Sequence, residues 1–382
     1  MDFKLTDEQQ LMVKSLTELL QREVPESYLT ECDTNHEAPS KGWKTLADNG
    51  FLALGLPEKY GGTPADALTQ ILVLETLGRY ASPLATYYSM VFLLCHDVEL
   101  FGTEEQKAKT IPAIIKGDMQ LAVAITEPGA GSDDAAMTTT AEIKGDKVVI
   151  NGQKTWCTNA HQADYILLVT RDVKNPEPHK ALSMWLLPTN TPGVKIVQIP
   201  KMFLWTMGSC EVFLDNVVLP KTALVGELNN GWKQLMTNFG FERAGLAAMA
   251  LGMAQGALDD AASYANKRVQ FGKPIGSYQA IQHRIADMAM KIELMRNLTY
   301  KVAWMVDNGI SVRTEASMVK LYASVALNEV VDDAIQVMGG VGVMMGSRVQ
   351  RLWRDARMQR IGGGTDEMMY NAVGPTVLKQ YK

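Results

Sequence analysis

The stretch ITEPGAGSD, residues 125–133, separates a short apolar run from a polar segment. It contains two glycines, and glycine lets the backbone approach a ligand closely because no Cβ stands in the way. Successive free N–H groups in such a turn form a concavity that suits an anion or the electron-rich edge of a ring. Taken alone, the stretch is explained more simply as a tight connection after a strand, since glycine-rich loops are common.

Length and composition are typical of a globular enzyme. The chain has 382 residues and a net charge of −5, which argues against nucleic acid as the main partner. No apolar run has the length of a membrane span, and the N-terminus lacks the features of a signal peptide. Four scattered cysteines without a CxxC predict a cytoplasmic protein without disulfides, and five dispersed histidines predict no metal site.

Three patterns follow one another along the chain. Helical spacing of apolar residues prevails up to about residue 118, with capping boxes predicted at Thr6 and Thr103. Short β-prone runs without intervening helices then predict a small antiparallel barrel or sandwich, and long helical patterns from residue 232 predict a bundle. We expect a multi-domain α+β fold: a helical domain over 1–118, a β domain over 119–231 and a helical bundle over 232–382.

Some boundaries are predicted more closely. Separate helices are expected at 67–78 and 87–100, and Asn151-Gly152 is expected to be a turn that ends one strand and starts another. The small residues of 244–258 predict a helix packed closely on a neighbour.

Several later segments carry chemically useful residues. Trp156-Cys157-Thr158, Glu242-Arg243 and the segments 268–273, 336–340 and 360–367 are the candidates. Each also has a plain structural explanation: a core tryptophan, charges at a helix end, or a glycine C-cap.

Taken together, the motifs ITEPGAGSD, INGQKTWCTN, FERAG, KRVQFGKPI, QVMGG and IGGGTDE resemble, in this order, the acyl-CoA dehydrogenase family of flavoproteins. The resemblance runs from the first helix to the last. The family fold, a helical lobe followed by a β-barrel and a four-helix bundle, agrees with the three patterns. Within the family, the sequence is most similar to the crotonobetainyl-CoA reductase branch of bacterial enzymes.

The resemblance implies an FAD site and an oligomer, by family habit a homotetramer, in which the chains share these sites. The residues that would line or cover the flavin are Val123, Ala124, Ile125, Thr126, Ser132, Trp156, Cys157 and Thr158. Those that would reach the FAD of a neighbouring subunit or its ADP half are Arg268, Gln270, Phe271, Gln279, Gln336, Gly339 and Gly340. Thr365 and Glu367 would close the same cofactor site.

The reaction of the family removes an α-proton from an acyl thioester while a hydride leaves Cβ for flavin N5, so a carboxylate must lie over Cα. Many members keep this carboxylate immediately before the Gly-Thr of the last motif, where this chain has Gly363. Glu242 matches the alternative position of the isovaleryl-CoA and long-chain branches. We expect Glu242 to be the base, its pKa raised by desolvation, with Asp366 and Glu367 as alternatives.

The substrate would be held by Ser132, Arg243 and Gly364, and the N–H of Gly363 would polarise the thioester carbonyl together with a flavin ribityl hydroxyl. Gly240 stands where the family often has an aspartate that touches CoA. Tyr87 and Tyr88 either shorten the acyl pocket or simply pack the first lobe.

The resemblance implies an FAD-dependent acyl-CoA dehydrogenase, or an enoyl-CoA reductase in the reverse direction, that exchanges electrons with electron-transfer flavoprotein. Two alternatives stay open at this point. One is an acyl-CoA oxidase that uses oxygen, and the other is a non-catalytic oligomeric scaffold of the same fold.

Overall fold

The computed structural model describes residues 4–382, except for the side chains of residues 91–93. The chain begins with a lobe of five α-helices: α1 (Asp7–Glu23), α2 (Glu26–Asn35), α3 (Ser40–Asp48), α4 (Ala67–Phe101) and α5 (Glu104–Ile115). The predicted capping boxes are confirmed: the hydroxyl of Thr6 accepts from the Gln9 N–H, and Thr103 and Gln106 make the same reciprocal pair.

Helix α4 consists of two helical segments that meet at a kink, in agreement with the separate helices expected at 67–78 and 87–100. It runs through residues 67–101, with non-helical backbone at Ala81 (φ −150°, ψ 57°) and Pro83 directly beyond it. Proline has no N–H to donate and its ring clashes with the preceding turn, so the first helical segment stops at the kink and the second begins there.

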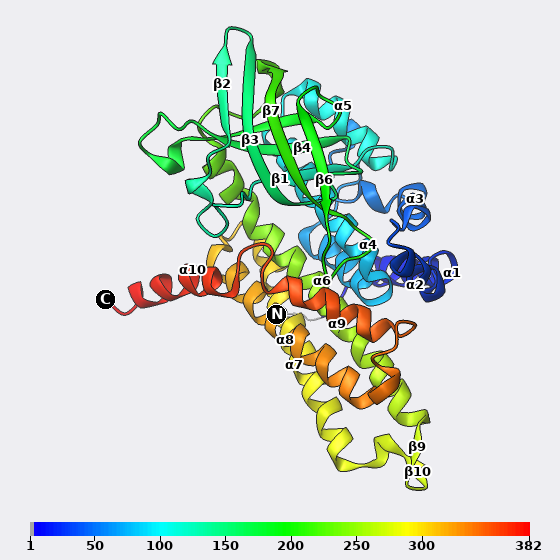
Figure 1. Ribbon diagram of the computed structural model, residues 1–382. Helices are drawn as coiled ribbons and strands as arrows, with labels where there is room; N and C mark the ends of the chain where they lie inside the picture. Colours follow the sequence, from blue (N-terminus) through cyan, green and yellow to red (C-terminus); the bar gives the residue numbers. More distant parts are fainter. Residues whose placement is uncertain (1–3) are drawn as a thin grey trace.

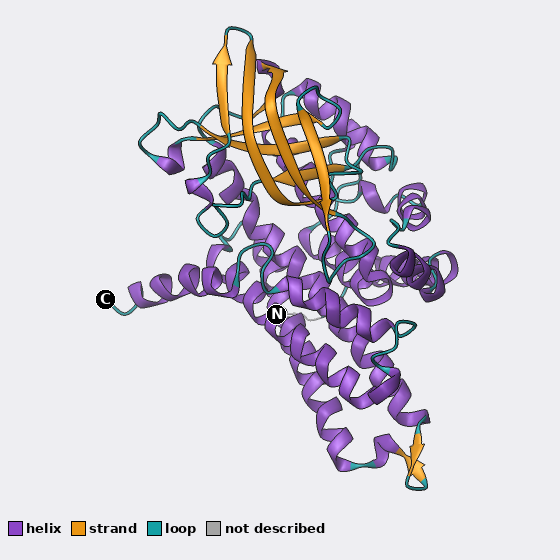
Figure 2. Ribbon diagram, viewed as in Figure 1, coloured by secondary structure: helices purple, strands orange, loops and turns teal. Residues whose placement is uncertain are grey.

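A curved sheet follows the helical lobe (Figure 2). Its strands are β1 (Leu121–Ala124), β2 (Thr140–Lys144), β3 (Lys147–Thr158), β4 (Tyr165–Arg171), β5 (Leu182–Pro188), β6 (Val194–Ile199), β7 (Ser209–Pro220) and β8 (Leu224–Val225). The strand order is β6-β7-β3-β2-β4-β5-β8, and β1 pairs with β4.

The sheet is not wholly antiparallel, contrary to expectation. β1 runs parallel to β4, with Leu121 opposite Tyr165, while the β2–β3, β3–β7, β4–β5, β5–β8 and β6–β7 pairs are antiparallel. The expectation assumed that a parallel pair needs a crossover helix. Here the connection from β1 to β4 contains the β2–β3 hairpin in place of a crossover helix.

The predicted turn at Asn151-Gly152 is wrong. β3 continues through both residues while it pairs with β7, and the register shifts by one residue between Ile150 and Gly152. An Asn-Gly pair favours a hairpin, but a strand can absorb it as a bulge when its neighbour continues alongside.

The C-terminal part is helical: α6 (Gly231–Lys267), α7 (Gln279–Asp307), α8 (Arg313–Met338), α9 (Arg348–Gln359) and α10 (Asp366–Lys379). Between α6 and α7 the short strands β9 (Val269–Gln270) and β10 (Lys273–Pro274) form a hairpin at the end of the bundle away from the sheet (Figure 1). The close packing predicted for 244–258 is confirmed, because a Cβ at Gly252 would lie 2.0 Å from the Glu75 carbonyl oxygen of α4.

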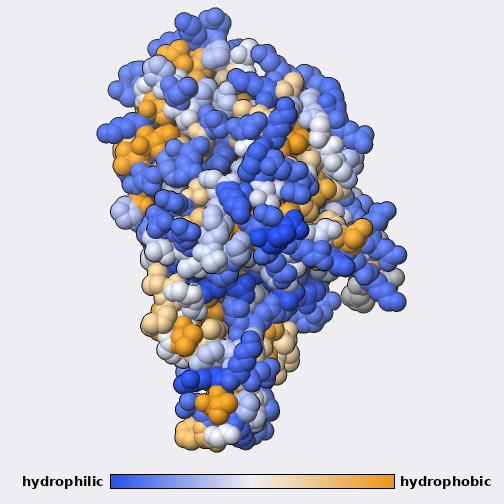
Figure 3. Space-filling model, turned by 90° about the vertical axis from the view of Figure 1, so that its right-hand side faces the viewer, coloured by the Kyte–Doolittle hydropathy of each residue, from blue (hydrophilic) through white to orange (hydrophobic). Residues whose placement is uncertain are grey.

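Hydrophobic residues on the face seen in Figure 3 occur in small groups among hydrophilic ones, including a group at the tip of the bundle. Among residues 4–382, no helix combines the length and the apolar character needed to cross a bilayer.

Candidate active site

The loop after β1 is held by a buried ion pair that the sequence reasoning missed. The Lys154 ammonium lies 2.9 Å from the Glu127 carboxylate and 2.8 Å from the Ile125 carbonyl oxygen, and both side chains are buried. The carboxylate also accepts from the backbone N–H groups of Thr138 and Thr139 at 2.7 and 2.9 Å. Burial opposes the charge of Glu127, but Lys154 and these donors lower its pKa to about 2.

This ion pair positions a compact turn. Glu127 and Ala130 exchange two backbone hydrogen bonds, at 3.0 and 3.1 Å, and the Thr155 N–H donates to the Thr126 carbonyl at 2.9 Å. A Cβ at Gly129 or Gly131 would meet no atom within 4 Å, so the turn presents bare backbone to open space. Such a surface can receive a large planar or anionic ligand without displacing a side chain.

Trp156 is presented by a second irregularity of β3. The register against β7 shifts between Lys154 and Cys157, and Trp156 has φ 57° with its indole 62% exposed. Lys154 and Cys157 point into the protein on either side of it. Because Trp156 is exposed, it is not a core aromatic. An exposed tryptophan in left-handed backbone is energetically costly, which favours a role in binding a ligand.

The other flavin candidates of the β domain lie beside this turn. Val123 and Ala124 belong to β1, Ile125 and Thr126 follow it directly, and Thr158 ends β3. Ser132 is exposed on the same loop, whereas Cys157 is buried in the sheet core. The eight predicted residues of the β domain therefore lie on β1, its loop and the end of β3, with the side chains of Ala124 and Cys157 buried in the sheet core.

Glu242 lies near the start of α6, half-buried among residues of three helices. Burial raises the pKa of its carboxyl to about 7, although the charges of Arg243 and Lys320 oppose the shift. A carboxyl with this pKa is balanced between its two forms near neutral pH, which is the property that a general base requires.

A second carboxyl, from Asp97 of α4, faces Glu242. Asp97 is buried and accepts a hydrogen bond from the Asn238 amide at 3.2 Å. Burial and the nearby charge of Glu242 raise the pKa of Asp97 to about 7. The two carboxyls repel each other when both are ionised, so together they hold a proton more readily than either would alone.

A side chain at Gly363 would be strained and would displace the end of the Leu246 side chain. Gly363 and Gly364 have φ of 66° and 96°, and a Cβ at Gly363 would lie 2.5 Å from Leu246 Cδ1. Leu246 follows Glu242 by one helical turn on α6, so both face the same way. The helix that carries the glutamate thus also fills the space that a side chain at 363 would need.

Lys320 of α8 is a further site residue that the sequence reasoning missed. It is buried, and its ammonium donates to the Gly364 carbonyl. Burial lowers the pKa of Lys320 to about 8, and the carboxylate of Asp366 is the main group that opposes this shift. The apolar spacing of α8 could not reveal it, because a buried lysine follows no hydrophobic period.

Arg243 turns away from Glu242, as adjacent residues on a helix do. Its guanidinium donates to the Ser317 hydroxyl at 3.0 Å and lies over the Phe239 ring at 5.6 Å. Among the described residues, its buried Nε has no hydrogen-bond partner. A guanidinium with a donor to spare next to the Gly364 turn is suited to an anionic or carbonyl ligand.

The alternative bases are occupied elsewhere. The Asp366 carboxylate accepts from Arg360 at 2.7 Å and from the Ser324 hydroxyl at 3.3 Å. Glu367 is exposed in the first turn of α10, where hydrogen bonds from its own backbone N–H and from Thr365 lower its pKa. Thr365 is the N-cap of this helix and accepts from the Met368 N–H at 3.3 Å.

The remaining cofactor candidates do not join the rest within one chain. Arg268, Gln270 and Phe271 belong to the hairpin at the tip of the bundle (Figure 1), and Phe271 is 94% exposed with φ 51°. Gln279 begins α7. Gln336, Gly339 and Gly340 lie exposed at the end of α8, where Gly339 is the C-cap, as the structural explanation predicted.

Tyr87 and Tyr88 pack in the core of the first lobe. Both are buried, and their hydroxyls donate to the carbonyls of Thr206 at 2.9 Å and Phe51 at 3.3 Å. These bonds favour packing as their role.

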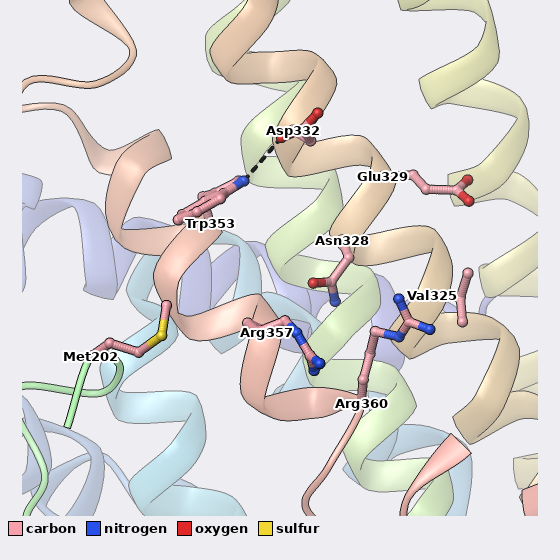
Figure 4. A pocket seen from close by; sticks show the side chains of 8 residues that line it. All are labelled: Met202, Val325, Asn328, Glu329, Asp332, Trp353, Arg357 and Arg360. Atoms are coloured by element: carbon pink, nitrogen blue, oxygen red, sulfur yellow. Dashed lines mark hydrogen bonds between the residues drawn. The ribbon is translucent and has the colours of Figure 1, made fainter. Parts of the chain in front are cut away.

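A separate hollow of about 300 Å³ lies between α8, α9 and the loop after β6 (Figure 4). In it the Trp353 indole donates to Asp332 at 3.1 Å, and Arg357 and Arg360 approach Asn328. It is lined by Met202, Val325, Asn328, Glu329, Asp332, Trp353, Arg357 and Arg360. Glu242, Asp97 and the glycine turn lie outside this hollow.

Comparisons with known proteins cover the whole chain. Residues 6–118 match the family model of the acyl-CoA dehydrogenase N-terminal domain, 122–217 the middle domain and 229–378 the C-terminal domain. The chain is 45% identical over 385 residues to the probable acyl-CoA dehydrogenase YdiO of Escherichia coli strain K12, and the match covers 100% of both.

Solved structures agree. Butyryl-CoA dehydrogenase from Megasphaera elsdenii superposes with a TM-score of 0.94 at 33% identity, covering 99% of this chain and 100% of that one. A chain from the work on the electron transferring flavoprotein of Acidaminococcus fermentans has a TM-score of 0.94 at 34% identity, with 99% and 100% covered. The chain therefore belongs to the acyl-CoA dehydrogenase family of FAD-dependent oxidoreductases.

Proposed function

We propose that this protein oxidises the Cα–Cβ bond of an acyl-CoA thioester and that Glu242 is the base that removes the α-proton. The observation that carries the proposal is the packing of α6 against the last glycine turn, which places a carboxyl group on α6 and none at position 363. Glu242 projects from α6 with its pKa near 7, while a side chain at position 363 would have positive φ and would have to displace Leu246. Asp366 and Glu367, the other carboxylates of the motif, are held by partners or exposed.

Glu242 can act as the base because its raised pKa gives its carboxylate a higher affinity for the α-proton. An acidic side chain with its usual pKa binds a proton too weakly to remove one from carbon, whereas a desolvated carboxylate near pKa 7 binds it far better and is still largely ionised at pH 8. Substrate bound against Glu242 would exclude more water from the carboxylate and raise its proton affinity further.

The negative charge that forms on the thioester oxygen needs donors. In this proposal the Gly363 N–H supplies one, in a turn that Lys320 holds through a hydrogen bond to the Gly364 carbonyl, two peptide groups further on. Arg243 has a buried donor to spare beside the same turn and would contact the CoA arm or the thioester, together with Ser132 from the β domain.

The residues present fit the FAD that the family uses. The open backbone at Gly129 and Gly131, the exposed Trp156 and the neighbouring Thr158 form a surface that suits a flat ring with polar edges. Residues 123–126, Ser132, Trp156, Cys157 and Thr158 would hold it there, with Thr365 and Glu367 on the bundle side. When bound, FAD supplies the acceptor for the hydride that leaves Cβ.

The oligomer is part of the proposal. The exposed hairpin with Phe271 lies at the bundle end away from the sheet, so Arg268, Gln270 and Phe271 cannot approach the β-domain surface of their own chain (Figure 1). They would instead reach the site of a neighbouring chain, with Gln279, Gln336, Gly339 and Gly340, in a homotetramer. We also propose electron-transfer flavoprotein as the electron partner, a cytoplasmic location, and domains at 1–118, 119–231 and 232–382.

The experiment is an anaerobic titration of the purified FAD-loaded protein with a panel of saturated acyl-CoAs, followed by flavin bleaching. The wild type is expected to bleach with at least one of them and Glu242→Gln is not, although both bind FAD. Equal bleaching of both proteins would remove Glu242 as the base. If only enoyl-CoA reoxidises chemically reduced protein, the enzyme works as a reductase, and a colourless protein would support a scaffold.

A further inference from the structure

We propose that Lys320 is a positioning residue for this reaction: one buried ammonium holds the Gly362–Gly364 turn and keeps the base Glu242 in its ionised form. The inference rests on the proposed function of Glu242 and adds a residue to which neither the sequence motifs nor the comparisons point.

The geometry begins with the bond to the turn. The Lys320 ammonium donates to the Gly364 carbonyl, and a Cβ at Gly363 would lie 4.0 Å from Lys320 Cε. The Lys320 side chain therefore lies against both glycines, which have positive φ values and no side chains of their own. A lysine that fixes the Gly364 carbonyl fixes the peptide group between Gly364 and Thr365, and with it the C-terminal side of the turn that carries the Gly363 N–H.

The charges around Lys320 come from two neighbouring elements. Glu242 and Arg243 face it from α6, and Asp366 and Glu367 from the start of α10. Asp366 is already bound by Arg360 and the Ser324 hydroxyl, and Glu367 is exposed, so their attraction for the ammonium is shared or screened.

Glu242 has fewer groups to compensate its charge. Asp97 of α4 repels it, Arg243 is directed to Ser317, and Lys320 is the buried cation on its α8 side. Desolvation of the carboxylate is therefore opposed mainly by two cations, Arg243 and Lys320, and Lys320 also donates a hydrogen bond to the Gly364 carbonyl of the turn. A change at Lys320 must then reach both the base and the turn that carries the carbonyl-binding N–H.

A merely structural lysine would behave differently. If only the hydrogen bond to Gly364 mattered, an uncharged donor of similar length would serve, and the proton affinity of Glu242 would not change. The charge has a distinct signature, because loss of a nearby cation makes a carboxylate harder to ionise.

The test compares Lys320→Met, Lys320→Gln and Lys320→Arg in the FAD-loaded protein. The pKa of Glu242 is read from the infrared C=O band of its protonated carboxyl, which is identified by its loss in Glu242→Gln. Both neutral variants are expected to raise this pKa by about one unit, and arginine is expected to hold it near the wild-type value. Lys291→Met, which removes an ammonium bound by Asp287 and Glu329, is the matched control with no shift.

The same variants are then measured for flavin reduction across pH. The pH at half-maximal rate should move upward with the infrared pKa, with kcat affected more than KM, and arginine should restore most of the rate. An unchanged Glu242 pKa in folded Lys320→Gln would overturn the proposal. If no acyl-CoA reduces the wild type, the proposed function fails instead, while the infrared titration still decides whether Lys320 controls Glu242.

Discussion

Two glutamates of this protein, Glu127 buried and Glu242 half-buried, have opposite properties. Glu127 of the β domain is paired with Lys154 and accepts from two backbone N–H groups, and its pKa falls to about 2. Glu242 of the bundle has no such set of donors and faces Asp97, and its pKa rises to about 7. Burial raises the pKa of both carboxyl groups, so the neighbouring groups decide whether the pKa ends below or above its usual value. The first glutamate is a fixed structural clamp, and the second is free to exchange a proton.

The largest loss of stability is expected when the ion pair between Lys154 and Glu127 is removed. Lys154→Met leaves the Glu127 carboxylate buried without its cation, and we expect a loss of about 3–5 kcal/mol in the free energy of unfolding. Urea unfolding measures it, with Lys147→Met, an exposed lysine of the same strand, as the control. The double variant with Glu127→Gln should recover part of the loss. A loss below about 1 kcal/mol would show that the pair is not a clamp.

A carboxylate introduced at position 363 tests whether the glycine turn beside Glu242 can accept a base at that position. Gly363→Glu places a side chain at φ 66° and 2.5 Å from Leu246 Cδ1, so we expect a destabilisation of about 1–3 kcal/mol. Added to Glu242→Gln, it should not restore flavin reduction. Leu246→Ala added to Gly363→Glu should relieve part of the strain. Full activity of the Glu242→Gln/Gly363→Glu protein would refute the steric argument.

The two glutamates should also respond to pH in opposite directions. The folded pKa of Glu242, about 7, lies above its usual value of 4.5, so the folded state binds an extra proton between these values and stability falls as pH rises through this window. Glu242→Gln should therefore be more stable than the wild type at pH 8, by about 1–2 kcal/mol given its partial exposure, and equal at pH 5. For Glu127, whose pKa is lowered, stability is instead lost as pH falls from 4.5 towards 2.

Thermal unfolding at both pH values checks this prediction. A stability difference of the same size at pH 5 and pH 8 would mean that packing, and not the proton, accounts for the effect of the glutamine.

The smallest effect concerns the neighbour of the base. Asp97→Asn removes the repelling carboxylate and keeps its size, so we expect the pKa of Glu242 to fall by about half a unit to one unit. The pH profile of flavin reduction should shift to lower pH by the same amount. Asp48→Asn, at an exposed position on α3, is the control. A shift to higher pH would contradict the like-charge pairing.

Local patterns predicted most of the fold. The capping boxes at Thr6 and Thr103 and the order of a helical part, a sheet and a helical bundle were predicted from local patterns, and the structure confirms them. The parallel pairing of β1 with β4 was missed, because alternation identifies strands without showing which of them are neighbours. The bulge at Asn151-Gly152 was read as a turn because its pairing with β7 depends on residues some sixty positions away.

The candidate site was predictable only where a motif marks it. Glu242, Gly363 and Trp156 stand out because the motifs single out these positions. Asp97 and Lys320 have no motif, and they meet Glu242 only through the packing of α4 and α8 on α6. Lys154 was not recognised because the sequence does not show that its strand position faces the core.

The most direct test of the central claim is the pH dependence of anaerobic flavin reduction in a single turnover, measured for the wild type and Glu242→Gln with the best acyl-CoA. The account predicts a wild-type rate that rises through pH 7 as Glu242 ionises, and a variant slower by about 10²–10⁴-fold with no such rise. A variant that reduces its flavin at the wild-type rate, with the same pH dependence, would contradict the assignment of Glu242 as the base.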